Sequence, residues 1–308
     1  MKTDKANQMK NRPQKSKGLS ENVSYSILLF PFILLFFMFT ILPILSSLCL
    51  SFFDYDMVSK PIWSGLTNYL RMFTGDKTFL IVLKNTMIMA VITGPVSFLI
   101  AFILAWSISE FSPVVRTFLA FLFYAPALVG NAYYIWQIAF SGDSNGYINS
   151  LLLSFGLINE PIVWFKNISY NMTIILIVQL WMSMGVSFLS NIAGIQNVSP
   201  DLYEAGAIDG IRNRWQELWY ITLPSMKSIL LFGAVMQIQA SFSIGAVVTA
   251  LAGYPSVNNS VDTIVTYLTD IGTMRYEFGY AAAISVILFL IMIFVRVVVG
   301  NLLNLLGK

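Results

Sequence analysis

Uncharged polar side chains recur at helical spacing inside the apolar segments of this sequence. Gln179 and Ser183 stand four residues apart, and Gln237, Ser241 and Gly245 repeat that interval on a later segment. Residues four apart share one face of an α-helix. Amides and hydroxyls on one face, with aromatic rings nearby, suit hydrogen bonding to a neutral polar molecule. The polar candidates and their aromatic neighbours are Gln179, Ser183, Ser187, Asn191, Gln237, Gln239, Ser241, Ser243, Trp181 and Phe242.

These polar groups also have a structural interpretation. Polar side chains inside a membrane-spanning helix are costly, and they face either a cavity or another helix. Those that face another helix hydrogen-bond across the interface and hold the helices together. The residue types and their spacing leave both interpretations open.

Groups for covalent or metal chemistry are scarce. The chain has no histidine, which excludes His-based catalysis, haem ligation and most zinc chemistry. Its one cysteine, Cys49, excludes a disulfide framework and any CxxC metal site. The pattern G-x-x-x-x-G-K-[ST] is also missing, so the chain cannot hydrolyse ATP in the P-loop manner. We expect no catalytic residue, no metal site and no bound cofactor.

The composition requires lipid as the solvent of these segments. The 308 residues are 57% hydrophobic and 11% charged, whereas soluble domains carry about 25% charge. The net charge of +3 is too small and too dispersed to indicate a nucleic-acid partner. The sequence therefore predicts an all-α integral membrane protein.

Six segments are long and apolar enough to cross a bilayer, which takes about 20 residues. We expect kinks at Pro31 and Pro43 in the first segment, at Gly94-Pro95 in the second and at Pro126 in the third. A basic N-terminal tail at 1–25 would precede a six-helix domain at 26–306. The expected spans are 26–53, 79–109, 114–140, 172–196, 225–252 and 278–306.

The basic residues predict the orientation of these spans. Six spans place 12 Lys and Arg on the side of the two termini and 6 on the other side. The positive-inside rule then places both termini and the loop at 197–224 in the cytoplasm. The external connections at 54–78, 141–171 and 253–277 are too short for a folded binding domain. Any domain that captures a solute must belong to another polypeptide.

The polar loop at 197–224 has the signals of two short helices joined by a turn. Ser199 and Pro200 suit the N-cap and first position of a helix, and Gly210 suits the left-handed position that ends it. Pro224 then ends the loop. A second helix would carry Trp215, Leu218, Trp219 and Thr222 on one stripe. The alternative is a helix lying in the interface, with its tryptophans at the lipid headgroups.

This loop resembles the EAA loop of binding-protein-dependent ABC importer permeases of the sugar, maltose-type subfamily. The resemblance extends over most of residues 26–306. Gly206 departs from it, because the family motif has alanine there, and one extra residue separates Gly210 from Ile221. The matching residues are Leu202-Tyr203-Glu204-Ala205-Gly206, Ile208-Asp209-Gly210, Trp215, Ile221-Thr222-Leu223-Pro224, Asn85-Thr86, Gly253-Tyr254-Pro255 and Phe278-Gly279-Tyr280-Ala281-Ala282-Ala283.

The resemblance implies that the loop is a coupling helix, which inserts into a cleft on a separate ATP-hydrolysing subunit. Glu204 would meet a basic residue there, Gly210 would form the turn, and Ala205 and Gly206 would permit close approach. Glycine in place of alanine should also loosen the helix by about 0.5–1 kcal/mol. The implied coupling residues are Tyr203, Glu204, Ala205, Gly206, Asp209, Gly210 and Pro224. The implied substrate pathway is Gln179, Ser183, Gln237 and Ser241, which fall where the maltose permease subunit contacts sugar.

The same resemblance implies the partners of the chain. They are a second homologous permease subunit, a cytoplasmic ABC ATPase dimer that binds ATP and Mg²⁺, an extracellular solute-binding protein, membrane lipid, and a sugar or oligosaccharide substrate. The location would be the plasma (inner) membrane of a prokaryote. A secondary transporter driven by an ion gradient is the alternative, but it would need ionisable residues in mid-span, and the spans hold essentially none.

Overall fold

The computed structural model describes residues 21–305, with side chains for 25–303. Most of the basic tail expected at 1–25 therefore lies outside the described residues. The chain divides into two units, Met1–Cys49 and Leu50–Lys308.

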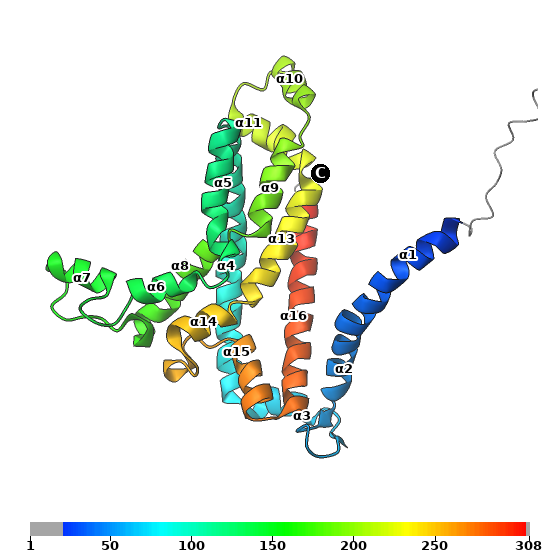
Figure 1. Ribbon diagram of the computed structural model, residues 1–308, viewed down its shortest axis with the longest axis vertical. Helices are drawn as coiled ribbons and strands as arrows, with labels where there is room; N and C mark the ends of the chain where they lie inside the picture. The colour runs from blue at the N-terminus through cyan, green and yellow to red at the C-terminus, as the bar shows by residue number, and fades with distance from the viewer. Residues whose placement is uncertain (1–20, 306–308) are drawn as a thin grey trace, which may run out of the picture. The chain divides into compact units, whose positions relative to one another are not determined.

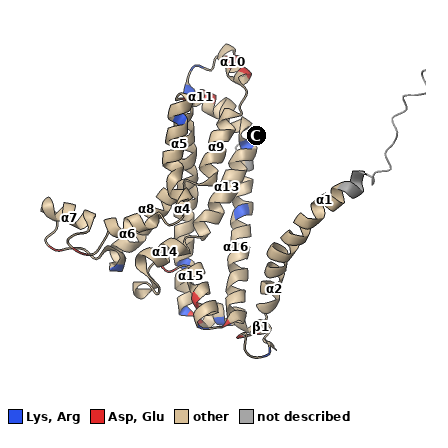
Figure 2. Cartoon of the chain, in the orientation of Figure 1, with Lys and Arg blue, Asp and Glu red and all other residues tan. Residues whose placement is uncertain are grey.

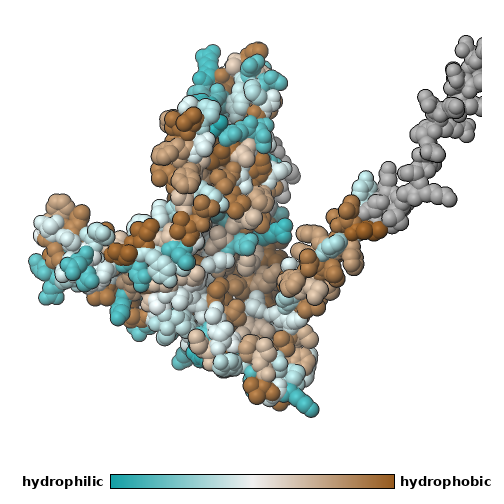
Figure 3. Space-filling model, viewed as in Figure 1, coloured by the Kyte–Doolittle hydropathy of each residue, from teal (hydrophilic) through white to brown (hydrophobic). Residues whose placement is uncertain are grey.

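The first unit is an apolar helix with a π-helical turn in its middle. It consists of α1 (Glu21–Phe36), η1 (Phe37–Ile41) and most of α2 (Leu42–Leu50). Pro43 has no amide hydrogen to donate to residue 39, which lies inside the π-helical turn. Pro31 stands within α1. Most described side chains of this helix are exposed and apolar, and brown and tan predominate on it in Figure 3, as expected of a surface solvated by lipid.

The regular structure of the second unit is helical apart from one short hairpin. Its two strands have two residues each, and Phe53 pairs with Trp63. Its elements are β1 (Phe53–Asp54), β2 (Ile62–Trp63), α3 (Thr67–Leu70), η2 (Arg71–Gly75), α4 (Lys77–Ser109), α5 (Pro113–Leu128), α6 (Tyr133–Ala139), α7 (Tyr147–Ser154), η3 (Trp164–Lys166), α8 (Ile168–Met182), α9 (Val186–Gln196), α10 (Pro200–Ile208), α11 (Arg214–Glu217), η4 (Leu218–Thr222), α12 (Leu223–Ser225), α13 (Lys227–Phe242), α14 (Gly245–Ala252), η5 (Val257–Asn259), α15 (Ile264–Thr269), η6 (Asp270–Met274) and α16 (Phe278–Leu305).

The helices α4, α9 and α13 form the centre of this bundle, and α16 packs on α13 (Figure 1). The long helix α4 buries residues at intervals of three and four, Val82, Met89, Ala101 and Ala105 among them, so that one face packs and the other meets lipid. Figure 2 shows most charged residues gathered at the two ends of the bundle and few between them. The charges thus lie where an aqueous phase would meet the bundle.

The expected spans correspond to helices, but two of them are broken. Among the described residues, four single helices are long and apolar enough to cross a membrane: Tyr25–Leu50, Lys77–Ser109, Lys227–Ala252 and Phe278–Leu303. The span expected at 114–140 is α5 and α6, bent by 82°, and that expected at 172–196 is α8 and α9, bent by 41°. Six spans result if each bent pair crosses once.

The position of the sharpest bend differs from the expected kink. Helix α5 continues past Pro126 to Leu128, and the break follows at Gly130, whose φ is +65°. Only glycine adopts this backbone conformation without a steric cost, so the bend occurs there. Helix α4 continues through Pro95 as one helix. The all-α membrane fold is confirmed.

Candidate functional site

The loop at 197–224 folds as two short helices that differ in length. Ser199 is the N-cap residue of α10 and Pro200 its first residue, although the Ser199 side chain makes no capping hydrogen bond. Gly210 has a φ of +96° in the turn that follows, so its left-handed conformation is as predicted. Asn213 begins α11 by accepting a hydrogen bond from the Gln216 amide at 2.9 Å.

One face of α10 packs on the chain itself. Gly206 is buried, and a Cβ there would lie 2.7 Å from Cδ1 of Ile221 and 3.0 Å from Cδ1 of Ile211. Tyr203 is half-buried, and its hydroxyl lies 3.0 Å from Oγ1 of Thr222. Gly206 therefore permits close approach of α10 to Ile211 and Ile221 of its own chain. The sequence analysis instead expected Gly206 to permit close approach of the ATPase subunit. This contact also gives the departure from alanine a physical reason.

The opposite face of α10 is exposed. Glu204, Ala205 and Asp209 are open to solvent, and Ile208 is 87% exposed at the end of the helix. Figure 1 shows α10 at the extreme end of the bundle. An exposed isoleucine between two carboxylates is a surface that a protein partner can cover.

The second helix is attached to the end of α4. The Arg214 guanidinium bonds Glu110, which follows α4, at 2.9 Å through Nε and 2.7 Å through the terminal nitrogen. It also reaches Glu217 at 3.0 Å. The Trp215 and Trp106 ring centroids lie 5.1 Å apart. A displacement of α11 would therefore act on α4.

The expected stripe of Trp215, Leu218, Trp219 and Thr222 is wrong. Leu218 and Thr222 are buried, whereas both tryptophans are mostly exposed. The reason is that Leu218–Thr222 forms the π-helical turn η4, which has more residues per turn than an α-helix and changes which side chains share a face.

Hydrogen bonds connect three residues of the implied substrate pathway, Gln179, Ser183 and Gln237, across α8, α9 and α13, whereas Ser241 lies against Gly94 of α4. All four pathway residues are buried. The Gln179 amide donates to the carbonyl of Ala240 at 3.3 Å, and the Gln237 amide donates to the carbonyl of Ser183 at 3.3 Å. Ser183 Oγ lies 2.7 Å from Oγ of Ser97 on α4. In this conformation Gln179, Ser183 and Gln237 make hydrogen bonds between helices, as the structural interpretation predicts, whereas the Ser241 hydroxyl donates to the carbonyl of Ile238 on its own helix at 2.8 Å.

A cavity of about 520 Å³ lies beside these residues, between α4, α13 and α16. Gln237 and Ser241 are the only predicted pathway residues in its wall. The rest of the wall is predominantly apolar and includes Phe98, Phe242 and Val299. A sugar needs many hydrogen-bond partners, so this cavity suits hydrocarbon better than sugar.

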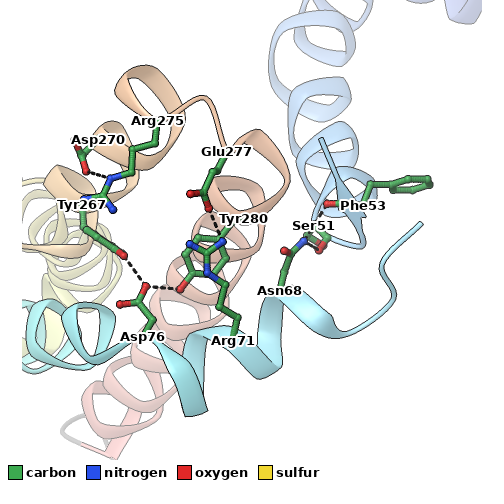
Figure 4. Close-up of polar contacts among 10 residues, drawn as sticks. All are labelled: Ser51, Phe53, Asn68, Arg71, Asp76, Tyr267, Asp270, Arg275, Glu277 and Tyr280. Atoms are coloured by element: carbon green, nitrogen blue, oxygen red, sulfur yellow. Dashed lines mark hydrogen bonds and ion pairs between the residues drawn. The ribbon is translucent and has the colours of Figure 1, made fainter. Parts of the chain in front are cut away.

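The end of the bundle away from α10 holds a polar network that the sequence analysis missed (Figure 4). Asp76 is the N-cap residue of α4 and accepts a hydrogen bond from the Phe79 amide at 2.9 Å. Its second oxygen accepts from the hydroxyls of Tyr267 at 2.5 Å and Tyr280 at 2.6 Å. Arg71 pairs with Glu277 and lies 4.1 Å above the Tyr280 ring. We call Arg71, Asp76, Tyr267, Glu277 and Tyr280 the Asp76 cluster.

The Asp76 cluster stabilises the ionised carboxylate. Burial opposes the charge, but the hydrogen bonds from the two tyrosines and from Phe79, together with the nearby Arg71, hold the pKa of Asp76 below its usual value. Burial and the bond to this carboxylate raise the pKa of Tyr267. Asp76 lies 191 residues from Tyr267 and 204 residues from Tyr280 in the sequence, and no local pattern indicates these contacts.

Comparison with known proteins identifies the family. Residues 97–306, more than half of the chain, match the family described as binding-protein-dependent transport system inner membrane component. The chain belongs to this family. It is a permease-type membrane protein.

Relatives and solved structures agree with this assignment. The chain is 30% identical over 288 residues to the probable ABC transporter permease protein YesP of Bacillus subtilis, covering 90% of each chain. It is 31% identical to the arabinooligosaccharides transport system permease protein AraP of Halalkalibacterium halodurans, covering 90% of this chain and 87% of AraP. The fold matches a bacterial alginate ABC transporter, crystallised with an alginate pentasaccharide-bound periplasmic protein, with a TM-score of 0.75 at 20% identity, covering 94% of this chain and 98% of that one.

The other motifs of the permease resemblance meet in the structure. The Asn85 amide donates to the carbonyls of Asn259 at 2.7 Å and Asp262 at 3.1 Å. Thr86 accepts from the Ile264 amide at 2.8 Å. The Asn85-Thr86 pair of this permease thus holds the connection that follows Gly253-Tyr254-Pro255. Burial raises the pKa of the Asp262 carboxyl inside that connection.

Proposed function

We propose that the chain is the membrane-spanning subunit of an ATP-driven importer of a sugar or oligosaccharide, with α10 as its coupling helix. The observation that carries the proposal is the two-faced packing of α10. Gly206 and Tyr203 fasten one face to η4. The face with Glu204 and Ile208 is exposed beyond the bundle.

This packing lets a force on α10 reach the membrane helices. Ile221, which contacts Gly206, lies in η4, and η4 leads through α12 into α13. Arg214 and Trp215 connect the same loop to the end of α4. A partner that displaces α10 therefore moves α13 and α4 together, and the polar groups between these helices move with them.

The exposed face also indicates what the partner presents. Glu204 and Asp209 call for basic groups, and Ile208 calls for an apolar surface next to them. The partner is an ABC ATPase dimer on the cytoplasmic side, which binds ATP and Mg²⁺. With Gly206 directed inward, Ala205 is the small residue that permits close approach of the ATPase. Gly210 forms the turn, and Pro224 begins the return towards α13.

The transported solute is a neutral oligosaccharide or sugar. The arabinooligosaccharide relative and the alginate transporter favour a carbohydrate. The amides and hydroxyls of Gln179, Ser183, Gln237 and Ser241 suit a neutral one. A solute-binding protein delivers the solute, and a second homologous permease completes the pathway. Both termini lie in the cytoplasm, on the side of the ATPase.

ATP binding closes the ATPase dimer and draws α10 towards the coupling helix of the second permease. The bundle then opens outward to receive the solute. ATP hydrolysis returns the bundle to a conformation that opens inward. A transporter driven by an ion gradient would give the exposed face of α10 no role, because it has no ATPase subunit for that face to bind. The family match also favours the importer over that alternative.

The test replaces Glu204 with alanine in the complex reconstituted with its ATPase, its second permease and its solute-binding protein. We expect Glu204→Ala to reduce ATPase association and ATP-dependent uptake of labelled oligosaccharides at least tenfold, because a charge-assisted contact is lost. The matched control is Glu160→Ala, an exposed carboxylate between α7 and η3, which should leave both unchanged. Normal association and uptake by the Glu204→Ala variant would disprove the coupling role.

A further inference from the structure

A line of buried polar residues continues past the implied substrate pathway towards the α10 end of the bundle. Gln179, Ser183, Ser187 and Asn191 follow one another at intervals of four along α8 and α9. All four are buried, and the last two are 1% and 0% exposed. On the facing helix α13 the corresponding line ends at Gly233. We call the contact of Ser187 and Asn191 with Gly233 the α9–α13 seam.

The two halves of this line differ in their hydrogen bonds. Gln179 and Ser183 have partners on α13 and α4. By contrast, Ser187 Oγ and both polar atoms of the Asn191 amide have no partner among the residues that the structure describes. Three buried polar atoms therefore stand without hydrogen bonds in one seam.

The backbone of α13 covers these atoms. A Cβ at Gly233 would lie 2.9 Å from Oγ of Ser187 and 3.7 Å from Oδ1 of Asn191. The glycine thus lets α13 press directly onto the unpartnered groups. A second glycine repeats this close approach nearer the loop, because a Cβ at Gly194 would lie 2.6 Å from Cε of Met226, just before α13.

An unpartnered buried amide makes this packed arrangement less stable than an apolar side chain of the same shape would. Its cost disappears in an arrangement where water or a solute reaches the amide. Asn191 lies within two helical turns of the end of α9, where the loop that carries α10 begins, and Ser187 lies one turn further from it. Motion passed from α10 into the start of α13 therefore reaches the Gly194–Met226 contact and then the seam, before it reaches Gln237 and Ser241.

We propose that Ser187 and Asn191 form the polar wall of the inward half of the solute pathway, closed here by Gly233 and opened when α13 moves off α9. The inference rests on the proposed function, since the motion comes from the ATPase through α10. In the open state the Asn191 amide donates to and accepts from hydroxyl groups of a neutral solute or water. The Ser187 hydroxyl does the same. Neither residue carries charge, which matches a neutral carbohydrate.

The test measures water access to the seam in the assembled transporter. Cys49→Ser provides a background without cysteine, and Asn191→Cys and Ser187→Cys are made in it. A membrane-impermeant methanethiosulfonate is applied without nucleotide, with a non-hydrolysable ATP analogue, and after vanadate trapping. We expect the labelling rate at both positions to change at least tenfold between nucleotide states. The matched control is Ile192→Cys, which is also buried but belongs to the apolar cluster of Ala101 and Phe188, and which should label slowly in every state.

Asn191→Leu gives an independent readout. It removes the unpartnered amide while keeping the number and branching of the side-chain heavy atoms, so it should raise the unfolding midpoint of the nucleotide-free complex by a few degrees. The same change should reduce binding-protein-stimulated ATP hydrolysis at least fivefold, because the closed seam is favoured. If Asn191 only held the helices together, Asn191→Leu would lower the midpoint.

The outcomes separate this inference from the proposed function. Slow labelling of Asn191→Cys and Ser187→Cys in every nucleotide state, in a complex that hydrolyses ATP, would overturn the inference alone. A Cys49→Ser chain that folds but never associates with the ATPase would overturn the proposed function, and the inference with it.

Discussion

The carboxylates at the two ends of the bundle differ in whether the chain itself supplies their hydrogen-bond donors. At one end the Asp76 carboxylate accepts hydrogen bonds from Tyr267, Tyr280 and the Phe79 amide, so its acceptor positions are used within the chain. At the other end Glu204 and Asp209 are exposed on α10. A carboxylate that is already satisfied holds a structure together, whereas an exposed one can bind a partner. The Asp76 cluster therefore supports the structure, whereas the exposed carboxylates of α10 are available for the partner contact that we propose for that helix.

The largest expected effect comes from a glycine at the Asp76 end. A Cβ at Gly279 would overlap the carbonyl oxygen of Phe53, a backbone atom that cannot move away independently. We expect Gly279→Ala to destabilise the protein by about 3 kcal/mol, measured by thermal unfolding in detergent. The control is Gly300→Ala on the same helix, where nothing lies within 4 Å. Equal unfolding midpoints for the two variants would contradict the close packing of this end.

The second effect concerns Asp76 and its dependence on pH. Asp76→Asn should cost about 1.5–3 kcal/mol at neutral pH, because hydrogen bonds to a charged acceptor become neutral ones. The pKa of Asp76 is lowered in the folded protein, so its stabilisation is present above about pH 4 and is lost as the pH falls through the folded pKa.

Unfolding midpoints of wild type and Asp76→Asn, measured from pH 7 to pH 3, should therefore converge at acid pH. If the two curves stay parallel over this range, the Asp76 carboxylate does not provide the stabilisation.

A smaller effect is expected at the matching glycine of the α10 end. A Cβ at Gly206 meets only the flexible ends of Ile211 and Ile221, and alanine favours the helix by about 0.5–1 kcal/mol. The net change for Gly206→Ala should therefore stay below about 1 kcal/mol. Adding Ile221→Val, which removes the contacting methyl group, should make Gly206→Ala more favourable in a double-mutant cycle. Additive effects would show that Gly206 does not pack on Ile221.

The smallest effect is expected for the ion pair between Arg214 and Glu110. Both side chains are about half exposed, so Arg214→Gln should cost about 0.2–1 kcal/mol, and less at high salt. Arg275→Gln is the comparison at the other end, since its partner Asp270 is more buried. We expect it to cost more and to depend less on salt. The reverse order in salt titrations of the unfolding midpoint would contradict the comparison.

Local signals in the sequence were sufficient for part of the α10 loop. The start of α10 at Pro200 and the left-handed turn at Gly210 follow from the backbone preferences of those two residues. The predicted stripe through Trp215 and Thr222 was wrong, because a π-helical turn changes which side chains share a face of the helix. No residue type in this segment indicates the π-helical turn in advance. The break at Gly130 was likewise missed, since Pro126 is the stronger local signal.

Contacts between distant segments were beyond prediction from one sequence. From the sequence alone, Gly206 is expected to destabilise its helix, and its packing against Ile221 is evident only in the structure. Asp76 and Tyr280 are 204 residues apart, and although Tyr280 belongs to the motif at 278–283, nothing near either residue in the sequence indicates their contact. Such contacts depend on how whole helices pack, which the local pattern does not contain.

The sequence by itself determined that this chain is a helical membrane protein, and it placed the spans and the ordered loop between the fourth and fifth. Hydrophobicity and backbone preference are properties of short segments, so they can be recognised without a partner. Only the tertiary structure decided which face of α10 is free and which polar residues on α9 lack hydrogen bonds. Burial and hydrogen bonding depend on what the neighbouring helices bring to the same place, and that is settled only when the bundle packs.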